Sequence, residues 1–396
     1  MCNNLSNMKY NFDSVPCRKG TACIKFDENL SVFGRDNIIS MWIADMDFEV
    51  MPEITEAVIR RANHKVYGYG IRPASYFDAI VSWQQRRHNW TVKSEWLGFS
   101  PGVVAGFAFA IRALTNEGDG VVIQPPVYPP FADMINQNNR RLINNPMKIV
   151  NGRFEIDFED LDRKLEGAKA LLFCSPHNPT GRVFSKEELL RVGELCRKHN
   201  VKIISDEIHA DLIIKPNVFR SIASLNDDLA HRTITLTAPS KTFNIAGLAT
   251  SVTIIPDEKL RAAFNAECDR THAGGGNIFG TAALEVAYNE GEQWLDEVME
   301  YIAGNIDYVG KFLEENCPKI RHYKQQGTFL MWLDCREMGL EHKAMLDFWT
   351  NEARIGANDG ATFGEEGRGF VRLNIGTSRA VIEQAMAQLK EAYDKL

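Results

Sequence analysis

Three short apolar segments, each followed by a polar residue, limit the fold of this chain more than any other feature of its sequence. The polar residues are, in chain order, Asn178, Asp206 and Lys241, and the segments before them are residues 171–174, 201–205 and 233–236. Short apolar segments rich in β-branched residues are typical of buried strands in a parallel sheet. Ligands of open α/β sheets bind beyond the carboxyl ends of the strands. We therefore expect the three polar side chains to meet at one edge of one sheet, beside a ligand.

Strand and helix patterns alternate over about residues 52–288, which favours an α/β fold with a largely parallel sheet covered by helices. Residues 121–123 and 251–255 predict two more buried strands. Residues 185–199 predict a helix, because this stretch begins with the Ser-x-x-Glu spacing of a capping box.

A different pattern begins near residue 291, where helices dominate around two short strands. The expected elements are a long helix over residues 292–315, a strand at 329–333, a helix near 342–352, a strand at 369–375 and a final helix. We therefore predict three parts. They are an N-terminal segment, 1–50, that packs with the small domain; a large ligand-binding domain, 51–290; and a small C-terminal α+β domain, 291–396.

The charge and length of the chain exclude several classes of protein. Its net charge is −7 and it has no long basic run, so nucleic acid and anionic membranes are poor partners. No uncharged apolar stretch reaches about 18 residues, which argues against a membrane span. The first residues lack the apolar segment of a signal peptide, and the eight cysteines show neither disulfide nor metal-ligand spacing. We expect a cytoplasmic protein with reduced thiols and no metal site.

An amine, a carboxylate and an amide at one sheet edge suit a site for pyridoxal phosphate (PLP). Lys241 would hold the aldehyde as a Schiff base, Asp206 would keep the ring nitrogen protonated, and Asn178 would bond the ring hydroxyl. Each residue alone has a simpler interpretation. Lys241 could be a surface charge, Asp206 a helix cap or metal ligand, and Asn178 part of a turn between two prolines. Their shared position favours the cofactor.

Further residues extend this hypothesis to the phosphate and the substrate. The N–H groups of Val103 and Val104, at the start of a predicted helix, would receive the phosphate, and Ser240 would add a hydroxyl. Tyr128, between two pairs of prolines, would stack on the ring or simply pack in the core. Arg372 lies in an apolar strand and needs an anionic partner. A substrate carboxylate and a structural ion pair explain it equally well.

Several motifs resemble fold-type I PLP enzymes of the aminotransferase class I/II superfamily over nearly the whole chain. They are Ser-Pro-His-Asn-Pro-Thr-Gly at 175–181, Asp-Glu-Ile-His at 206–209, Ser-Lys-Thr-Phe-Asn-Ile-Ala-Gly-Leu at 240–248 and Gly-Phe-Val-Arg-Leu-Asn at 369–374. Others resemble the MalY/PatB-type cystathionine β-lyases, a group of carbon–sulfur lyases. These stand at 18–21, 44–48, 67–69 and 364–369.

The resemblance implies a mainly parallel seven-stranded sheet between helices, a smaller α+β domain and PLP as the cofactor. It implies the roles given above for Lys241, Asp206 and Asn178, and phosphate binding by the helix start and the serine. It implies that Tyr69 reaches the phosphate of a neighbouring subunit, so that the site needs a homodimer. It also implies that Arg372 clamps the substrate carboxylate, with Ala44 and Asp45 bordering the substrate.

Two positions depart from the wider aminotransferase pattern. His209 stands where that pattern has a tyrosine beside the cofactor, and Ala249 stands where it often has a phosphate-binding arginine. Both departures resemble the lyase subgroup.

The expected reaction is α,β-elimination from L-cystathionine or another cysteine S-conjugate, which yields a thiol, pyruvate and ammonia. An aminotransferase would use the same residues, and a regulatory protein-binding role of the same fold is a third hypothesis. A serine hydrolase is rejected, although residues 98–102 read Gly-Phe-Ser-Pro-Gly. Its oxyanion hole needs the N–H of the residue after the serine, and Pro101 has none.

Overall fold

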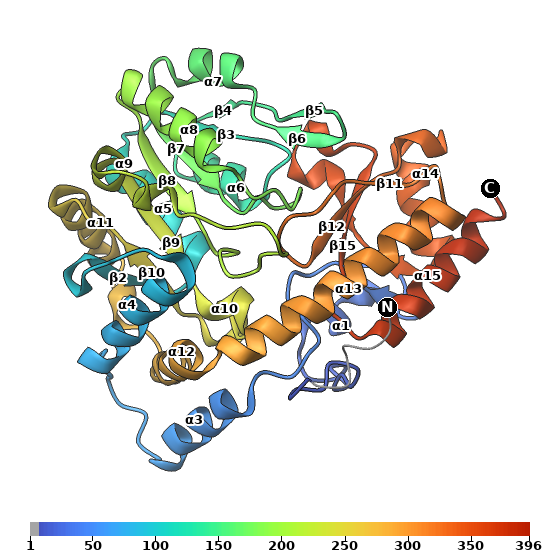
Figure 1. Ribbon diagram of the computed structural model, residues 1–396, viewed down its shortest axis with the longest axis horizontal. Coiled ribbons are helices and arrows are strands. Elements are labelled where there is room, and N and C mark those ends of the chain that lie inside the picture. Colours follow the sequence, from blue (N-terminus) through green and yellow to red (C-terminus); the bar gives the residue numbers. More distant parts are fainter. Residues whose placement is uncertain (1–7) are drawn as a thin grey trace.

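The computed structural model describes residues 8–396, and its centre is a seven-stranded sheet (Figure 1). The strand order is β2 (Leu97–Ser100), β10 (Ser251–Ile254), β9 (Thr233–Thr237), β8 (Lys202–Asp206), β7 (Ala168–Cys174), β3 (Gly120–Ile123) and β4 (Arg141–Asn144). Strand β10 runs antiparallel to β2 and β9, and the other pairs are parallel. The mainly parallel seven-stranded sheet is therefore confirmed.

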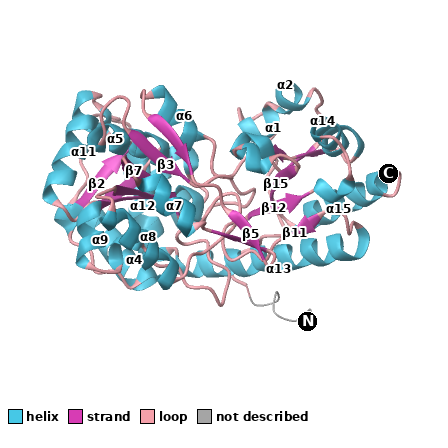
Figure 2. Ribbon diagram, turned by 90° about the horizontal axis from the view of Figure 1, so that it is seen from above, coloured by secondary structure: helices cyan, strands magenta, loops and turns pink. Residues whose placement is uncertain are grey.

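Alternate residues of the sheet face two separate hydrophobic cores, as the pleat of a strand requires. Within β3, Val121 and Ile123 pack with α5 (Val103–Leu114), whereas Val122 packs with α7 (Phe158–Leu165) and α8 (Lys186–Lys198). Figure 2 shows the strands between these two sets of helices. Helix α6 (Pro130–Gln137) and helix α11 (Glu258–Arg270) accompany α5.

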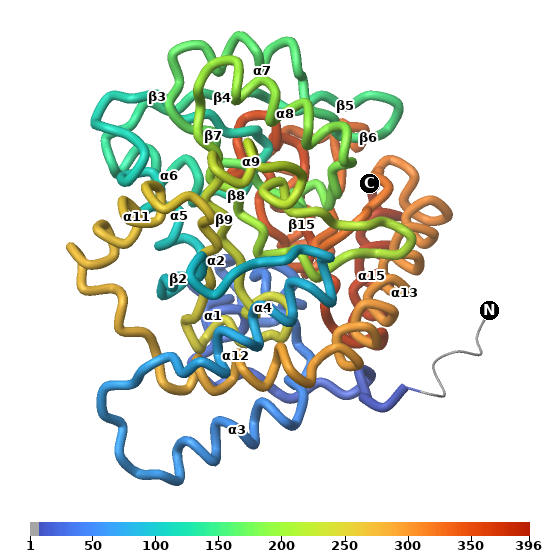
Figure 3. Tube along the Cα trace, turned by 60° about the vertical axis from the view of Figure 1, so that its left-hand side comes forward, coloured from blue at the N-terminus to red at the C-terminus, as the bar shows by residue number. Residues whose placement is uncertain are grey.

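Local sequence signals explain where several elements begin. Helix α8 starts after a complete capping box of Ser185 and Glu188, which confirms the predicted helix. The other described helices of this part are α3 (Pro52–Asn63), α4 (Ala74–His88), α9 (Asp227–Arg232), α10 (Pro239–Thr242) and α12 (Ile278–Glu290). Helices α3 and α12, far apart in sequence, lie side by side (Figures 1 and 3).

The C-terminal part has a four-stranded sheet and long helices. The strand order is β11 (Arg321–His322), β12 (Leu330–Asp334), β15 (Phe370–Asn374) and β14 (Asn358–Asp359). Its helices are α13 (Glu292–Asn316), α14 (His342–Asp347), which continues into a π-helical turn at Phe348–Glu352, and α15 (Arg379–Tyr393). The strands and helices expected here are therefore present.

The N-terminal segment joins this C-terminal part through a short strand pair. Strand β1 (Ile39–Ser40) runs parallel to β13 (Ile355–Gly356), after the short helices α1 (Ile24–Asp27) and α2 (Asn29–Phe33). The small antiparallel pair β5 (Lys148–Val150) and β6 (Arg153–Glu155) completes the strands described. The domain boundaries at residues 50 and 290 stay a prediction. None of the helices in residues 8–396 is long and apolar enough to cross a membrane.

Candidate active site

A cavity of about 230 Å³ lies at the carboxyl ends of β7, β8 and β9, where the sequence predicts a site. The predicted residues that line it are Ala44, Val103, Val104, Tyr128, Asn178, Asp206, His209, Ser240 and Lys241. Pro101, Gly102, Cys174, Ile208, Ala246, Ala249 and Thr250 also line it. The structure thus brings together residues from positions 44 to 250 of the chain.

Lys241 enters the cavity from α10, a single helical turn that Pro239 opens directly after β9. Its Nζ donates a hydrogen bond of 2.5 Å to the carbonyl oxygen of Ala44. Burial lowers the pKa of Lys241 to about 8, and although the carboxylates of Asp45 and Asp206 raise it, Arg372 lowers it further. A considerable fraction of the amine is therefore neutral near pH 8 and able to accept a proton.

Asp206 is the last residue of β8 and is held between Cys174 of β7 and Leu236 of β9. Its Oδ1 accepts a 3.1 Å hydrogen bond from the backbone N–H of Ile208. Burial raises the pKa of Asp206 to about 7, although this N–H and Lys241 lower it. A protonated ring nitrogen beside the carboxylate would favour its charged form, so the residue fits the pyridinium of PLP.

Arg372 reaches the site from β15 of the smaller sheet and is buried. Its Nη1 donates to Asn178 Oδ1 at 3.1 Å, and its Nη2 donates to the carbonyl of Trp42 at 2.8 Å and to Asn358 Oδ1 at 2.9 Å. These acceptors are all neutral, and Nε has no partner among the described residues. Burial lowers the pKa of the guanidinium to about 10. A buried arginine without a carboxylate in the described residues favours the substrate over the structural ion pair.

The start of α5 provides the surroundings expected for a phosphate. Val103 and Val104 are its first residues, and the first N–H groups of a helix have no acceptor within it. Ser240 faces the same cavity, as does Thr250, whose hydroxyl the sequence analysis missed. Ala249 also lines this cavity. It stands where the wider aminotransferase pattern often has a phosphate-binding arginine, so this position contributes no positive charge here.

His209 and Tyr128 both border the cavity, and burial shifts the pKa of each toward its uncharged form. Burial lowers the pKa of His209 to about 3, with Lys241 and Arg372 adding to the effect, so the imidazole is neutral. Its Nδ1 is buried and has no hydrogen-bond partner within residues 8–396. Burial and the nearby Asp206 raise the pKa of Tyr128.

Three predicted site residues do not line the cavity: Arg372, which bonds Asn178 in its wall, Asp45 and Tyr69. The Asp45 carboxylate bonds Arg18 at 2.6 Å. The Tyr69 side chain is fully exposed in the single chain. Their proposed contacts with substrate and with a neighbouring subunit stay predictions.

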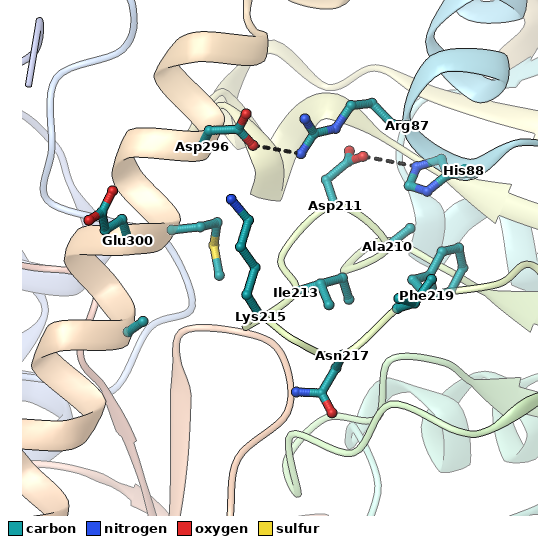
Figure 4. Close-up of a pocket in the computed structure, with 13 residues that line it drawn as sticks. Arg87, His88, Ala210, Asp211, Ile213, Lys215, Asn217, Phe219, Asp296 and Glu300 are labelled. Atoms are coloured by element: carbon teal, nitrogen blue, oxygen red, sulfur yellow. Dashed lines mark hydrogen bonds and ion pairs between the residues drawn. The ribbon is translucent and has the colours of Figure 1, made fainter.

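A second cavity, of about 470 Å³, lies beside α4 and α13 (Figure 4). It also contains acids and bases, and four of these form pairs with one another. Asp211 bonds His88 at 2.9 Å, and Arg87 bonds Asp296 at 3.0 Å. Asp211 also accepts from Thr242, next to Lys241, at 2.7 Å, and so anchors α10. The smaller cavity remains the better candidate, because Asp206 in its wall and Arg372 beside it have no such ion pair among the described residues.

The two groups that accept hydrogen bonds from Arg372 Nη2 were also not predicted from the sequence. Asn358 belongs to the two-residue strand β14 and lies opposite Arg372 in the sheet register. Trp42 contributes a backbone carbonyl from an irregular segment. Neither carries a pattern that a sequence reader can recognise.

Comparison with known proteins agrees with this fold. The family described as Aminotransferase class I and II matches residues 36–389, and the chain belongs to this family. It is 42% identical to cystathionine beta-lyase PatB of Bacillus subtilis (strain 168), over 96% of this chain and 99% of that protein. It is 32% identical to protein MalY of Escherichia coli (strain K12), over 97% of this chain and 98% of the relative.

A solved structure gives the same picture in three dimensions. Cystalysin from Treponema denticola, which contains a pyridoxal 5'-phosphate cofactor, superposes with a TM-score of 0.95. The two are 35% identical, and the match covers 98% of this chain and 100% of cystalysin. The predicted resemblance to the superfamily and to the PatB and MalY type is therefore confirmed.

Proposed function

We propose that this chain is a PLP-dependent carbon–sulfur β-lyase that acts on L-cystathionine or a related cysteine S-conjugate. The observation that carries the proposal is the buried Arg372, whose hydrogen-bond acceptors are all neutral. It bonds Asn178, which lines the same cavity as Lys241 and Asp206. The name of the relative PatB supports the same reaction.

The residues present fit PLP, which supplies an electron sink for the bond-breaking at Cα when it is bound. Lys241 offers the amine, and Asp206 offers a buried carboxylate for the ring nitrogen. Because Asn178 Oδ1 already accepts from Arg372, its Nδ2 is left to donate toward the ring hydroxyl. Val103, Val104 and Ser240 offer donors for the phosphate, and Tyr128 a ring to stack on.

Arg372 would bind the carboxylate of an α-amino acid through its guanidinium and so orient the substrate. Ala44 and Asp45 would border it. The free amine of Lys241 then takes the proton from Cα, which its pKa of about 8 permits near neutral pH. The Cβ–S bond breaks, the thiolate leaves with the electron pair, and released 2-aminoacrylate reacts with water to give pyruvate and ammonia.

The neutral state of His209 is compatible with this reaction, because a second cation beside Lys241 would hold back its reprotonation. We assign His209 a place beside the cofactor and no step of its own.

We also propose that the working form is a homodimer in which Tyr69 serves the phosphate of the other subunit. The exposed apolar side chains around it, Val66, Tyr67 and Ile71, support this, because such a surface is suited to a partner. The seven cysteines of the described residues are free thiols, which suits the reducing cytoplasm.

The test is to incubate the protein with PLP and L-cystathionine and to assay pyruvate and free thiol. We expect both products in equal amounts, and neither with Lys241→Ala, which should also lose the visible absorption of the bound cofactor. If no cysteine S-conjugate yields pyruvate, the proposal is wrong. Formation of a 2-oxo acid that retains the sulfur would identify an aminotransferase instead.

A further inference from the structure

A short irregular segment, Trp42 to Asp47, touches both residues on which the proposed reaction depends. We call it the carbonyl strap. The carbonyl of Ala44 accepts from Lys241 Nζ at 2.5 Å, and the carbonyl of Trp42 accepts from Arg372 Nη2 at 2.8 Å. Lys241 lies in α10, which follows β9 of the large sheet, and Arg372 lies in β15 of the small sheet, so the strap connects the two parts.

Side chains also bond three further carbonyls of the strap. Asn374 Nδ2 donates to the carbonyls of Ile43 and Asp45, at 2.6 and 2.5 Å. Asn244 Nδ2 donates to the carbonyl of Met46 at 2.9 Å, and Asn244 Oδ1 accepts from the Met46 N–H at the same distance. Backbone groups in an irregular buried segment need such donors, so the position of the strap is closely defined.

A cluster of charged side chains that do not line the cavity holds the strap. Lys25 is only 1% exposed, and its Nζ bonds Asp47 Oδ1 at 2.9 Å and the carbonyl of Asp45 at 3.2 Å. Arg18 bonds Asp47 at 2.8 Å and Asp45 at 2.6 Å from the more exposed side. A buried ammonium persists only where it is paired, so Lys25 ties the strap firmly to α1.

We propose that Lys25 is a positioning residue, which fixes the carbonyl strap and thereby sets the place of Arg372 relative to Lys241. Lys25 does not line the cavity, so it acts through the strap and not on the substrate. The inference depends on the proposed function only for what Lys241 and Arg372 do.

The main variant is Lys25→Met combined with Asp47→Asn, which removes both buried charges and leaves none of the pair uncompensated. Lys25→Arg keeps the cation and should rescue. Arg18→Gln removes a cation from the partly exposed side of the cluster, and it tests the same idea if the double variant does not fold. The matched control is Asn29→Ala, since Asn29 and Ser40 form a buried 2.7 Å hydrogen bond in the same N-terminal segment without contacting the strap.

Three measurements on the PLP-loaded protein separate positioning from general stability. The first is hydrogen exchange at the amides of Met46 and Asp47, which bond Asn244 and Gly376. The second is the Kd of L-alanine, which has no leaving group at Cβ, followed by the cofactor absorption. The third is kcat and KM for cystathionine.

In the double variant we expect faster exchange in the strap, a Kd for L-alanine raised about tenfold, and a loss of up to about 100-fold in kcat/KM, mainly through KM. Arg18→Gln should shift all three in the same direction by less, whereas Lys25→Arg and Asn29→Ala should stay near the wild type. Unchanged exchange, an unchanged Kd despite faster exchange, or an equal effect in Asn29→Ala would overturn the inference. If the wild type forms no pyruvate, the proposed function fails, but exchange and L-alanine binding still decide this one.

Discussion

Replacement of Arg372 separates the two explanations of a buried arginine. Arg372→Met keeps an unbranched, largely apolar side chain and removes the charge, together with the cation–π contact of Cζ, which lies 5.0 Å from the centre of the Phe363 ring. If the guanidinium exists for the substrate, the folded protein should do well without it. If it formed a structural ion pair, the loss of one partner would cost about 3–5 kcal/mol of the free energy of unfolding.

The structure indicates how much Arg372→Met should change the free energy of unfolding. Burial lowers the pKa of Arg372 from its ordinary 12.5 to about 10, which corresponds to roughly 3 kcal/mol against the charged form in the fold. Three hydrogen bonds to neutral acceptors offset about 1 kcal/mol each. The two contributions nearly cancel, so we expect Arg372→Met to change the free energy of unfolding by less than about 2 kcal/mol.

Substrate binding should respond quite differently. Two charge-assisted hydrogen bonds to a carboxylate contribute about 1.5–3 kcal/mol each, so their loss should weaken the binding of L-alanine by roughly 100-fold or more. Arg372→Lys keeps a charge but lacks the planar fork, and it should recover only part of the affinity. Urea unfolding of the wild type and both variants gives the stability, and titration of the cofactor absorption gives the affinity.

The wild type should also melt at a higher temperature with saturating L-alanine, because a ligand that binds only the folded state stabilises it. This increase should disappear in Arg372→Met. A variant that is destabilised by more than about 3 kcal/mol and still binds L-alanine as tightly as the wild type would refute the assignment of Arg372 to the substrate.

Three further predictions concern other parts of the site. Asp206→Asn should lower kcat by about 100-fold or more, because an amide cannot keep the ring nitrogen charged; a small effect in steady-state assays would contradict this. Burial raises the pKa of Glu207 from 4.5 to about 8, so its contribution to stability is complete below its unfolded pKa and declines as the pH rises toward 8. At alkaline pH, Glu207→Gln should therefore melt at a higher temperature than the wild type, with a free energy of unfolding larger by up to roughly 5 kcal/mol. At acidic pH the two proteins should differ little. Finally, a randomly paired equimolar mixture of Tyr69→Ala and Lys241→Ala should recover about one quarter of wild-type activity, since about half of its dimers are mixed and each mixed dimer has one intact site of two. No recovery would place Tyr69 in its own subunit's site.

The sheet edge was predictable because parallel strands leave little freedom to the residues that follow them. Once residues 171–174, 201–205 and 233–236 are recognised as neighbouring strands, Asn178, Asp206 and Lys241 have to lie together. The capping box of α8 was predictable because it depends only on two residues that are three positions apart in the sequence.

What escaped prediction depends on contacts that no local pattern encodes. Asn358 holds Arg372 through a strand of two residues, and Trp42 does so through a carbonyl that any residue type would supply. The carbonyl strap likewise depends on Asn244 and Asn374, which come from different halves of the molecule. Such contacts become visible only when both sheets are in place.

The same arrangement bears on the choice between elimination and transamination. Both reactions begin when Lys241 removes the proton from Cα, so the motif around the lysine does not distinguish them. They differ in whether the Cβ–S bond is aligned with the electron system that receives the charge, and alignment of this kind is set by how the substrate is held. Arg372 holds the carboxylate in our proposal, and the carbonyl strap holds Arg372. The ratio of pyruvate to sulfur-containing 2-oxo acid should therefore respond to changes in the strap, far from Lys241 in sequence, more than to the residues that flank the lysine.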